Sequence, residues 1–338
     1  MSEVAMVVPV LSSLVDTYKD LDITLVTNEK YVPMFEKMPN IEIFPIEILT
    51  RHSGKRGVFR LYHDLQELPK FDVIIDLQGK FRNKFLCFLF RILKGTHSYH
   101  VDMGMREKRR QVRPFMKKVT SSLESIYSRY VDVFTKVGFI FPLNFESIYP
   151  EKPTLSIEQS MLTGEKTGKW IGIAPFTKHT GKMLPLKKME RVIDQLSIIP
   201  DVKIFLFCAD NSVEEQFESW EKKYKNVVSL ANKINLRDEL RILANMDVMI
   251  SMDSVSLHLA SIVKTPTISI WGSTHRYSMG TVGWNQSREN VIEVPLKCRP
   301  CSLTGDDLCR RGDYACLNEI SVEQIVTQTK KLLDKTIK

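Results

Sequence analysis

A chain of 338 residues is too long for one ordinary hydrophobic core, and its length predicts two domains of about 150 residues each. The hydrophobic content of 43% and the charged content of 26% are typical of a globular protein in water. No apolar run reaches the ~18 residues that a membrane span needs, and no signal peptide is evident, so we expect a cytoplasmic protein. The net charge of +8 predicts an anionic partner: nucleic acid, a membrane surface or a phosphorylated substrate.

The positive charge gathers in residues 103–119, which carry seven Lys or Arg residues against one Glu. A run of this kind is most often a solvated loop face. No helix-turn-helix, zinc-finger or RNP pattern accompanies the run, so the sequence argues against nucleic acid as the partner.

In the first half of the chain, apolar stretches alternate with amphipathic ones, which predicts a parallel sheet covered by helices on both faces. Asp76 and Gln78 follow one expected strand, and strand-end side chains of such sheets reach the ligand crevice. An ordinary strand-to-helix turn, with Gly79 for geometry and Asn83 as the helix cap, explains the same residues equally well. The expected strands are residues 23–27, 41–45, 72–77 and 96–101, and the expected helices are residues 4–18, 30–37, 59–66, 83–93 and 121–137.

Residues 141–169 are rich in proline and polar residues, which predicts a linker and divides the chain into domains 1–160 and 161–338. The second domain alternates strands and helices as the first does, so we expect a second doubly wound α/β domain. Its expected strands are residues 170–174, 202–208, 226–230, 247–251 and 267–271, and its expected helices are residues 186–196, 213–223, 236–244, 255–263 and 320–338.

Asp253 and Ser254 stand between an apolar strand and a helix. Backbone N–H groups and the helix dipole favour a phosphate at such a position. His258 lies one helical turn after Ser254, so the two side chains can face one ligand. Taken alone, the pattern is better explained by Ser254 as a helix cap and His258 as a core residue.

The loop 174–185 follows the first strand of the second domain and contains Thr177, Lys178 and Lys182. Hydroxyl and ammonium groups beside a helix start can bind a diphosphate. The loop lacks the spacing of a P-loop, and a basic surface loop is the alternative. Glu214, after the next strand, can accept hydrogen bonds from ribose hydroxyls, as acidic residues do in dinucleotide sites.

These motifs resemble those of the ADP-heptose:lipopolysaccharide heptosyltransferases, glycosyltransferases with the GT-B fold of two Rossmann-like domains facing each other across a cleft. The donor-sugar motif of that family is roughly D-[ST]-G-x-x-H-x-A, a strand, and [FW]-G-x-T. This chain has DSVSLHLA at 253–260, with Val255 in place of the motif's Gly, and WGST at 271–274. The family's phosphate loop ends in K-x-[WL]-P, here Lys182 to Pro185, and Asp76 to Gly79 resembles its acceptor-side D-[LF]-[HQ]-G.

The resemblance implies an inverting transfer of heptose from ADP-heptose to a phosphorylated, lipid-anchored sugar of the lipopolysaccharide core. Residues 103–118 would then meet the acceptor or the anionic inner membrane face. Lys182 and the helix after Asp253 would stabilise the leaving diphosphate, so no divalent metal or other cofactor is expected. The implied substrate contacts are Gln78, Thr177, Lys178, Lys182, Glu214, Asp253, Ser254, Ser256 and His258.

The start of the sequence departs from the family, whose first strand precedes a loop with the catalytic Asp. That Asp falls on Glu3, and the strand itself is missing from this sequence. Either the reading frame begins late, or neighbouring strands close the gap; the intact order of the other elements favours the late start. Glu3 keeps the carboxylate but is longer by one CH2, and a misplacement of ~1 Å can cost ~100-fold in rate. Glu3 is therefore the base of a longer protein or a sign of impaired catalysis.

Three alternatives stay open. A non-catalytic sugar-nucleotide or lipid-binding relative fits the missing strand and Glu3. A basic nucleic-acid or membrane-surface module fits residues 103–118. The spacing of Cys298, Cys301, Cys309 and Cys316 permits a tetrahedral zinc site, although similar cysteines occur in the resembling family without an obvious metal requirement. In GT-B proteins a final helix such as 320–338 commonly packs back on the first domain.

Overall fold

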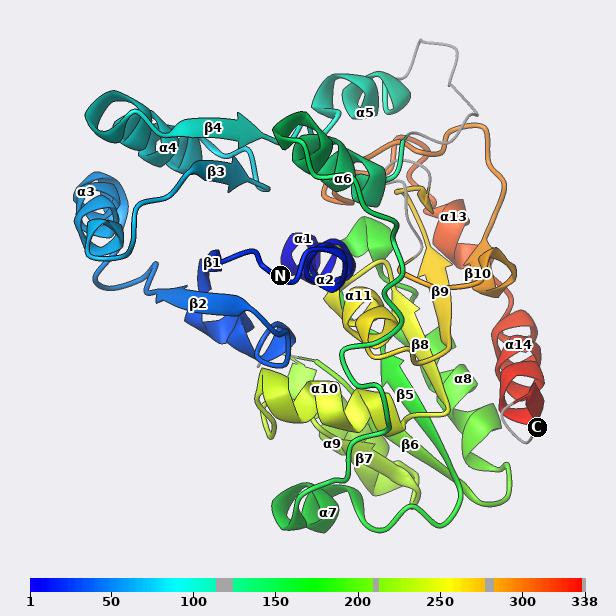
Figure 1. Ribbon diagram of the computed structural model, residues 1–338. Helices are drawn as coiled ribbons and strands as arrows, with labels where there is room; N and C mark the ends of the chain where they lie inside the picture. Colours follow the sequence, from blue (N-terminus) through cyan, green and yellow to red (C-terminus); the bar gives the residue numbers. More distant parts are fainter. Residues whose placement is uncertain (114–123, 209–212, 277–282, 336–338) are drawn as a thin grey trace. The chain divides into compact units, whose positions relative to one another are not determined.

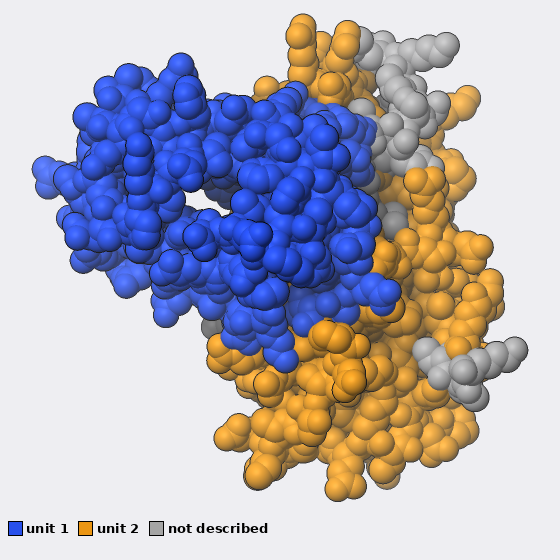
Figure 2. Space-filling view, viewed as in Figure 1, with its two compact units in different colours: residues 1, 3–105, 124–148 blue, residues 2, 106–123, 149–338 orange. Residues whose placement is uncertain are grey.

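The computed structural model of the protein describes residues 1–113, 124–208, 213–276 and 283–335 (Figure 1). The chain divides into two compact units: unit 1 is residues 1, 3–105 and 124–148, and unit 2 is residues 2, 106–123 and 149–338 (Figure 2). It passes into unit 2 at Tyr149, earlier than the expected boundary at residue 160. The helix α7 (Ile157–Thr163) begins in the expected linker, and its Gln159 donates a hydrogen bond to Asp238 within unit 2.

Unit 2 is built on a six-stranded parallel sheet with the order β10-β9-β8-β5-β6-β7. The first strand of the unit, β5, lies at the centre of this sheet. The next two strands, β6 and β7, extend the sheet to one side, and β8, β9 and β10 extend it to the other, so the unit is doubly wound as predicted. The helices α8 and α14 contact each other on one face, and α10 and α11 contact each other (Figure 1). The strands are β5 (Lys169–Ala174), β6 (Val202–Leu206), β7 (Val227–Ser229), β8 (Val248–Met252), β9 (Thr267–Trp271) and β10 (Val291–Glu293).

The core of unit 2 lies on both faces of its central strands. All residues of β8 and β9 are buried, because a central parallel strand is covered by helices on both sides. The final helix α14 (Val322–Lys335) places Val322, Ile325 and Val326 in this same core. The apolar face of this helix is therefore used within unit 2, and its expected packing on the first domain stays a prediction. The other helices are α8 (Leu186–Ser197), α9 (Glu214–Lys223), α10 (Leu236–Asn245), α11 (Val255–Ile262) and α13 (Ala315–Asn318), with 3-10 turns η2 (Thr180–Lys182) and η4 (Arg288–Asn290).

Unit 1 contains two separate parallel strand pairs. The strand β1 (Ile23–Asn28) pairs with β2 (Ile41–Ile46), and β3 (Val73–Asp76) pairs with β4 (His97–His100). No ladder joins β1 to β3 in the described part of unit 1. Both explanations of the departure at the start of the sequence stay predictions.

The helices of unit 1 follow the predicted positions with several differences. The single helix expected over residues 4–18 is divided into two, α1 (Ser2–Ala5) and α2 (Val8–Thr17). The expected α-helix over residues 30–37 is a 3-10 helix, η1 (Glu29–Met34), because Pro33 lies inside it and lacks the N–H that an α-helix needs. The basic run contains a short helix, α5 (Met105–Gln111), which belongs to unit 2 from residue 106 onward, whereas residues 114–119 lie outside the described residues. The others are α3 (Gly54–Gln66), α4 (Phe81–Lys94) and α6 (Ile126–Val137). None of the described helices is long and apolar enough to span a membrane.

Candidate functional site

A Lys–Asp ion pair stands at the carboxyl ends of the two central strands of unit 2. The Nζ atom of Lys182 lies 2.8 Å from Oδ2 of Asp253, and the two side chains are only 16% and 9% exposed. Asp253 directly follows β8, and Lys182 closes the η2 turn after β5. Because β5 and β8 are neighbours in the sheet, the two predicted substrate residues lie together at the carboxyl ends of these strands.

Thr274 joins this pair from a third strand. Its hydroxyl donates to Oδ2 of Asp253 at 2.8 Å, so the same carboxylate oxygen accepts from Lys182 and from Thr274. Thr274 ends the Trp-Gly-Ser-Thr stretch after β9, and its place in that motif was the one sequence signal that could have assigned it a role. The carboxyl ends of three adjacent strands therefore carry one polar cluster, which consists of Lys182, Asp253 and Thr274.

Two glycines let the loops of this cluster lie against each other. The N–H of Ser273 donates to the carbonyl of Gly181 at 2.8 Å. A Cβ atom at Gly272 would stand 2.4 Å from that carbonyl oxygen, and a Cβ at Gly181 would stand 2.6 Å from Oγ of Ser273. Only glycine at both positions permits this backbone approach, which sets where Lys182 stands relative to Asp253.

His258 lies on α11 behind the ion pair and is buried. Burial lowers the pKa of its imidazole to about 4; the charge of Asp253 opposes this shift and that of Lys182 adds to it. The ring is therefore neutral at physiological pH. Its Nδ1 atom is buried without a hydrogen-bond partner among the described residues, a costly arrangement that is uncommon in cores.

The remaining predicted residues of unit 2 are not part of the cluster. Ser254 is the residue before α11, but its side chain makes no cap hydrogen bond and lies 3.1 Å from Oγ of Ser251. Thr177 closes its own turn by donating to the carbonyl of His179, and Lys178 is exposed. Glu214 accepts from Asn232 at the start of α9, and Ser256 is half-buried on α11.

Unit 1 carries a second polar cluster, centred on the buried carboxylate of Asp76 at the end of β3. Oδ1 of Asp76 accepts from the backbone N–H groups of Gln78 and Gly79 and from the side chain of Asn83, each at 3.0 Å. Oδ2 lies 3.1 Å from Nδ1 of His100 at the end of β4. Asn83 therefore supports Asp76 and is not the helix cap, a position taken by Lys80.

Glu3 lies in unit 1 near the same strand ends. Its carboxylate is 4.0 Å from Nζ of Lys80, and its side chain is 41% exposed. Its backbone carbonyl accepts a hydrogen bond from the Tyr130 hydroxyl at 3.4 Å. His100 was missed by sequence reasoning, because a histidine at a strand end has no distinguishing pattern until its partner Asp76 is placed.

The sequence matches the model of glycosyltransferase family 9 (heptosyltransferase) over residues 58–309. The chain belongs to glycosyltransferase family 9. Lipooligosaccharide heptosyltransferase 2 of Campylobacter jejuni is 22% identical over 335 residues, which cover 98% of this chain and 95% of that protein. Lipopolysaccharide heptosyltransferase 3 of Escherichia coli K12 is 23% identical over 341 residues, which cover 96% and 93%.

Solved structures establish the fold. A family 9 glycosyltransferase from Veillonella parvula superposes with a TM-score of 0.73 at 18% identity and covers 99% of this chain and 95% of its own. The ADP-heptose lipopolysaccharide heptosyltransferase II of E. coli gives a TM-score of 0.68 at 16% identity, with coverage of 99% and 96%. The expected GT-B fold is confirmed. Family membership also makes this chain a glycosyltransferase and disfavours the non-catalytic alternative.

Behind the donor-motif loop of this glycosyltransferase lies a buried arginine that sequence reasoning missed. The Arg299 side chain is 3% exposed and donates to the carbonyls of Gly272 at 2.5 Å and Thr274 at 3.1 Å. It also donates to the carbonyl of Val294 and pairs with Glu293 at 3.1 Å. Arg299 therefore fixes the backbone that carries Thr274 to Asp253.

The four late cysteines of the glycosyltransferase are free thiols that lie near one another. Burial raises the pKa of Cys316 to about 11, and Cys301, Cys309 and Cys298 raise it further. Within the described ranges, no three His, Cys, Asp or Glu side chains are grouped so that they could hold a metal ion. The zinc alternative stays a prediction.

The neutral His258 makes stability depend on pH. Its pKa is about 4 in the folded protein against an ordinary histidine value of 6.5, so below pH 6.5 the unfolded chain takes up a proton that the folded one does not. We expect wild type to lose as much as ~3 kcal/mol more than a His258→Gln variant between pH 7 and pH 4. Urea unfolding of both proteins across this range tests the expectation, and a difference that is constant with pH would contradict it.

Proposed function

We propose that this glycosyltransferase transfers heptose from ADP-heptose to a phosphorylated, lipid-anchored sugar of the lipopolysaccharide core. The observation that carries the proposal is the buried Lys182–Asp253 pair, which occupies the donor-motif positions at the carboxyl ends of β5 and β8. Both named relatives are heptosyltransferases. A solved structure at 19% identity, E. coli heptosyltransferase WaaC, contains ADP-2-deoxy-2-fluoro heptose.

On the donor side, Lys182 supplies the positive charge that a leaving diphosphate requires. Its ammonium pairs with Asp253 in this structure. An incoming diphosphate competes for that ammonium, which leaves Asp253 held by Thr274 and able to accept from sugar hydroxyls. The N-terminus of α11, directly after Asp253 and Ser254, adds backbone N–H groups and a favourable dipole.

On the acceptor side, Glu3 is the proposed base. The acceptor hydroxyl oxygen forms a bond to C1 of the heptose, the bond from C1 to the ADP phosphate oxygen breaks, and the hydroxyl proton passes to the Glu3 carboxylate. Lys80 stands 4.0 Å from this carboxylate, beyond hydrogen-bond distance, so the carboxylate keeps room to accept a proton. Gln78 lies near the same strand ends and is proposed to contact the acceptor.

The basic run is proposed to bring the enzyme to its acceptor. Arg106, Arg109 and Arg110 are exposed on α5. A cluster of arginines near an anionic surface contributes about 1 kcal/mol of attraction per residue. We therefore place the enzyme in the cytoplasm, in peripheral contact with the anionic inner membrane face, with no role for nucleic acid.

The test is acceptor-dependent release of ADP from ADP-heptose, with lipopolysaccharide that lacks the accepting heptose position as the negative control. We expect Glu3→Gln to lower kcat by ~100-fold or more, because a positioned base contributes ~10²–10⁴-fold, and to leave the Kd for ADP-heptose unchanged. The matched control is Glu29→Gln, an exposed glutamate of unit 1.

Two results would reject parts of this proposal. Saturable ADP-heptose binding by wild type without turnover of any heptose acceptor would favour a sugar-nucleotide-binding protein. Full turnover by the Glu3→Gln variant would keep the transferase activity but remove Glu3 as the base.

A further inference from the structure

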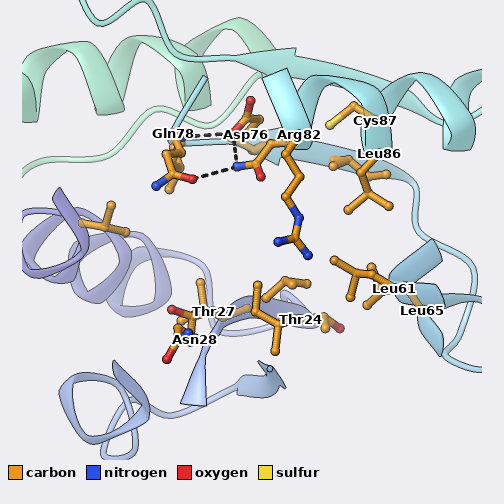
Figure 3. Close-up of a pocket in the computed structure, with 18 of the residues that line it drawn as sticks. Thr24, Thr27, Asn28, Leu61, Leu65, Asp76, Gln78, Arg82, Leu86 and Cys87 are labelled. Carbon is orange, nitrogen blue, oxygen red and sulfur yellow. Dashed lines mark hydrogen bonds between the residues drawn. The ribbon is translucent and has the colours of Figure 1, made fainter. Parts of the chain in front are cut away.

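The helix α4 of unit 1 carries apolar residues on two opposite sides. Its inner side lines the interior cavity of the unit, which Leu61 and Leu65 of α3 also line (Figure 3). The inner residues of α4 are Arg82, Asn83, Leu86, Cys87 and Phe90. A helix that covers a sheet normally buries one apolar side and turns a polar side to water. The outer side of α4 is therefore the one that requires an explanation.

Four large apolar residues run along the outer side of α4: Phe81, Phe85, Phe88 and Ile92. Each residue turns an α-helix by about 100°, so these four lie within about 60° of one another. Phe81 is 85% exposed, Phe88 53% and Ile92 65%. The rings of Phe85 and Phe88 stack with their centroids 6.5 Å apart. We call these four residues the outer stripe.

The neighbouring helix α3, which contacts α4, widens the outer stripe. The rings of Phe59 on α3 and Phe85 on α4 meet edge to face with their centroids 5.6 Å apart, and Phe59 is 46% exposed. We call the outer stripe and Phe59 together the apolar patch. Single apolar residues on a surface are ordinary, whereas a contiguous patch marks a site of interaction.

Positive charge accompanies the apolar patch. Helix geometry places Lys84 and Arg91 on one flank of the outer stripe, and both are exposed. Lys55 and Arg56 are exposed on α3, within one turn of Phe59. Neither α4 nor residues 54–63 contain an acidic residue. Exposed phenylalanines flanked by Lys and Arg complement an anionic bilayer, because the rings can insert below the headgroups while the cations stay at the level of the phosphates.

We propose that the apolar patch is a membrane-insertion surface, through which unit 1 docks on an anionic lipid bilayer with α4 lying in the plane of the headgroups. This docking surface rests on the proposed function, in which the enzyme meets a lipid-anchored acceptor. It goes further, since the basic run attracts the membrane by charge, whereas the outer stripe anchors the enzyme by burying apolar area.

A second copy of the chain is disfavoured as the occupant of the apolar patch. Two copies related by a two-fold axis would bring the same surface of each chain together. The cations of α3 and α4 would then face their own equivalents with no acidic residue of these segments between them, and such like-charge contacts oppose association.

The test is co-sedimentation of the full chain with vesicles of equal amounts of phosphatidylethanolamine and phosphatidylglycerol. The vesicles contain no acceptor, so the result does not depend on the transferase reaction. We expect Phe88→Gln with Ile92→Gln to lower the partition coefficient by ~10-fold or more, because two large apolar side chains no longer leave water. The matched control is Ile157→Gln with Met161→Gln on α7, where the two apolar residues are 81% and 82% exposed. This control is expected to bind as wild type does.

A variant of α5, Arg109→Gln with Arg110→Gln, measures the contact by charge separately. Binding that is lost in the α5 variant and unchanged in the outer-stripe variant would keep the proposed membrane contact and overturn insertion through the apolar patch. Dimerisation of wild type that the outer-stripe variant abolishes, in the absence of lipid, would assign the patch to a second copy and also overturn it.

Insertion itself is measured with Phe88→Trp and phospholipids brominated in their acyl chains. Wild type is the blank, because its tryptophans all belong to unit 2. We expect the additional fluorescence of the variant to shift to shorter wavelength on vesicles and to be quenched by the brominated lipids. Vesicle-bound protein whose additional fluorescence shows neither effect would overturn the proposal.

Discussion

Replacing Lys182 with methionine is expected to lower kcat by ~10²–10³-fold, the loss that follows removal of one preorganised group facing developing charge. Lys182 is the buried cation of the donor cluster, 2.8 Å from Asp253. Methionine preserves the length and apolar stem of the side chain, so the change removes charge with little change in packing. The affinity for ADP is expected to fall as well, since the proposed diphosphate contact uses the same ammonium. Acceptor-dependent ADP release and calorimetry of ADP binding measure the two effects.

The protein contains its own control for this experiment. A second Lys–Asp pair, Lys166 with Asp247 at 3.0 Å, stands at the opposite, amino end of the same strand β8. Asp247 also accepts from the backbone N–H of Trp170 at 2.8 Å, which marks it as structural. Lys166→Met is expected to lower stability and to leave kcat and ADP affinity unchanged. Equal loss of kcat in both variants would show that Lys182 acts through stability alone.

The sequence predicted unit 2 more closely than unit 1, and the reason lies in burial. The strand 267–271 was predicted with its observed bounds, because a fully buried parallel strand is a continuous apolar run. The segment 30–37 was predicted as an α-helix from its pattern, yet Pro33 makes it a 3-10 helix. In unit 1 the strands β1 and β3 are only partly buried, so the apolar pattern of the sequence defines the bounds of these strands less closely.

The motif residues of the site could be named in advance, but the contacts that position them could not. Asp253 could be named because it follows a strand, and Lys182 because its loop resembles the phosphate loop of the family. The approach of Gly181 to Gly272 depends on backbone atoms from loops about 90 residues apart, and a glycine in a loop carries no sequence sign of its neighbour. The same holds for His100, because its contact with Asp76 is formed only when β3 and β4 pair in the folded unit.

Replacing Arg299 with methionine is expected to lower the free energy of unfolding of unit 2 by ~3–5 kcal/mol, since three backbone carbonyls lose a buried charged donor at ~1–3 kcal/mol each, whereas Glu293 keeps Arg276 at 3.5 Å. The guanidinium is 3% exposed and donates to the carbonyls of Gly272, Thr274 and Val294 as well as to Glu293. Methionine fills the space of the stem but leaves three carbonyls and one carboxylate without this donor.

Tryptophan fluorescence during urea unfolding measures this effect on unit 2 alone, because all four tryptophans (170, 220, 271 and 284) belong to that unit. The matched control is Arg191→Met. Arg191 also pairs with a glutamate, Glu323, at 3.7 Å, but the Arg191 side chain is 64% exposed. An exposed pair of this kind contributes ~0–1 kcal/mol, so the control should unfold close to wild type. If the two variants unfold at the same urea concentration, the carbonyls of the 272–274 loop find other donors. The loop that holds Thr274 against Asp253 would then be stabilised by its backbone contact with Gly181 instead.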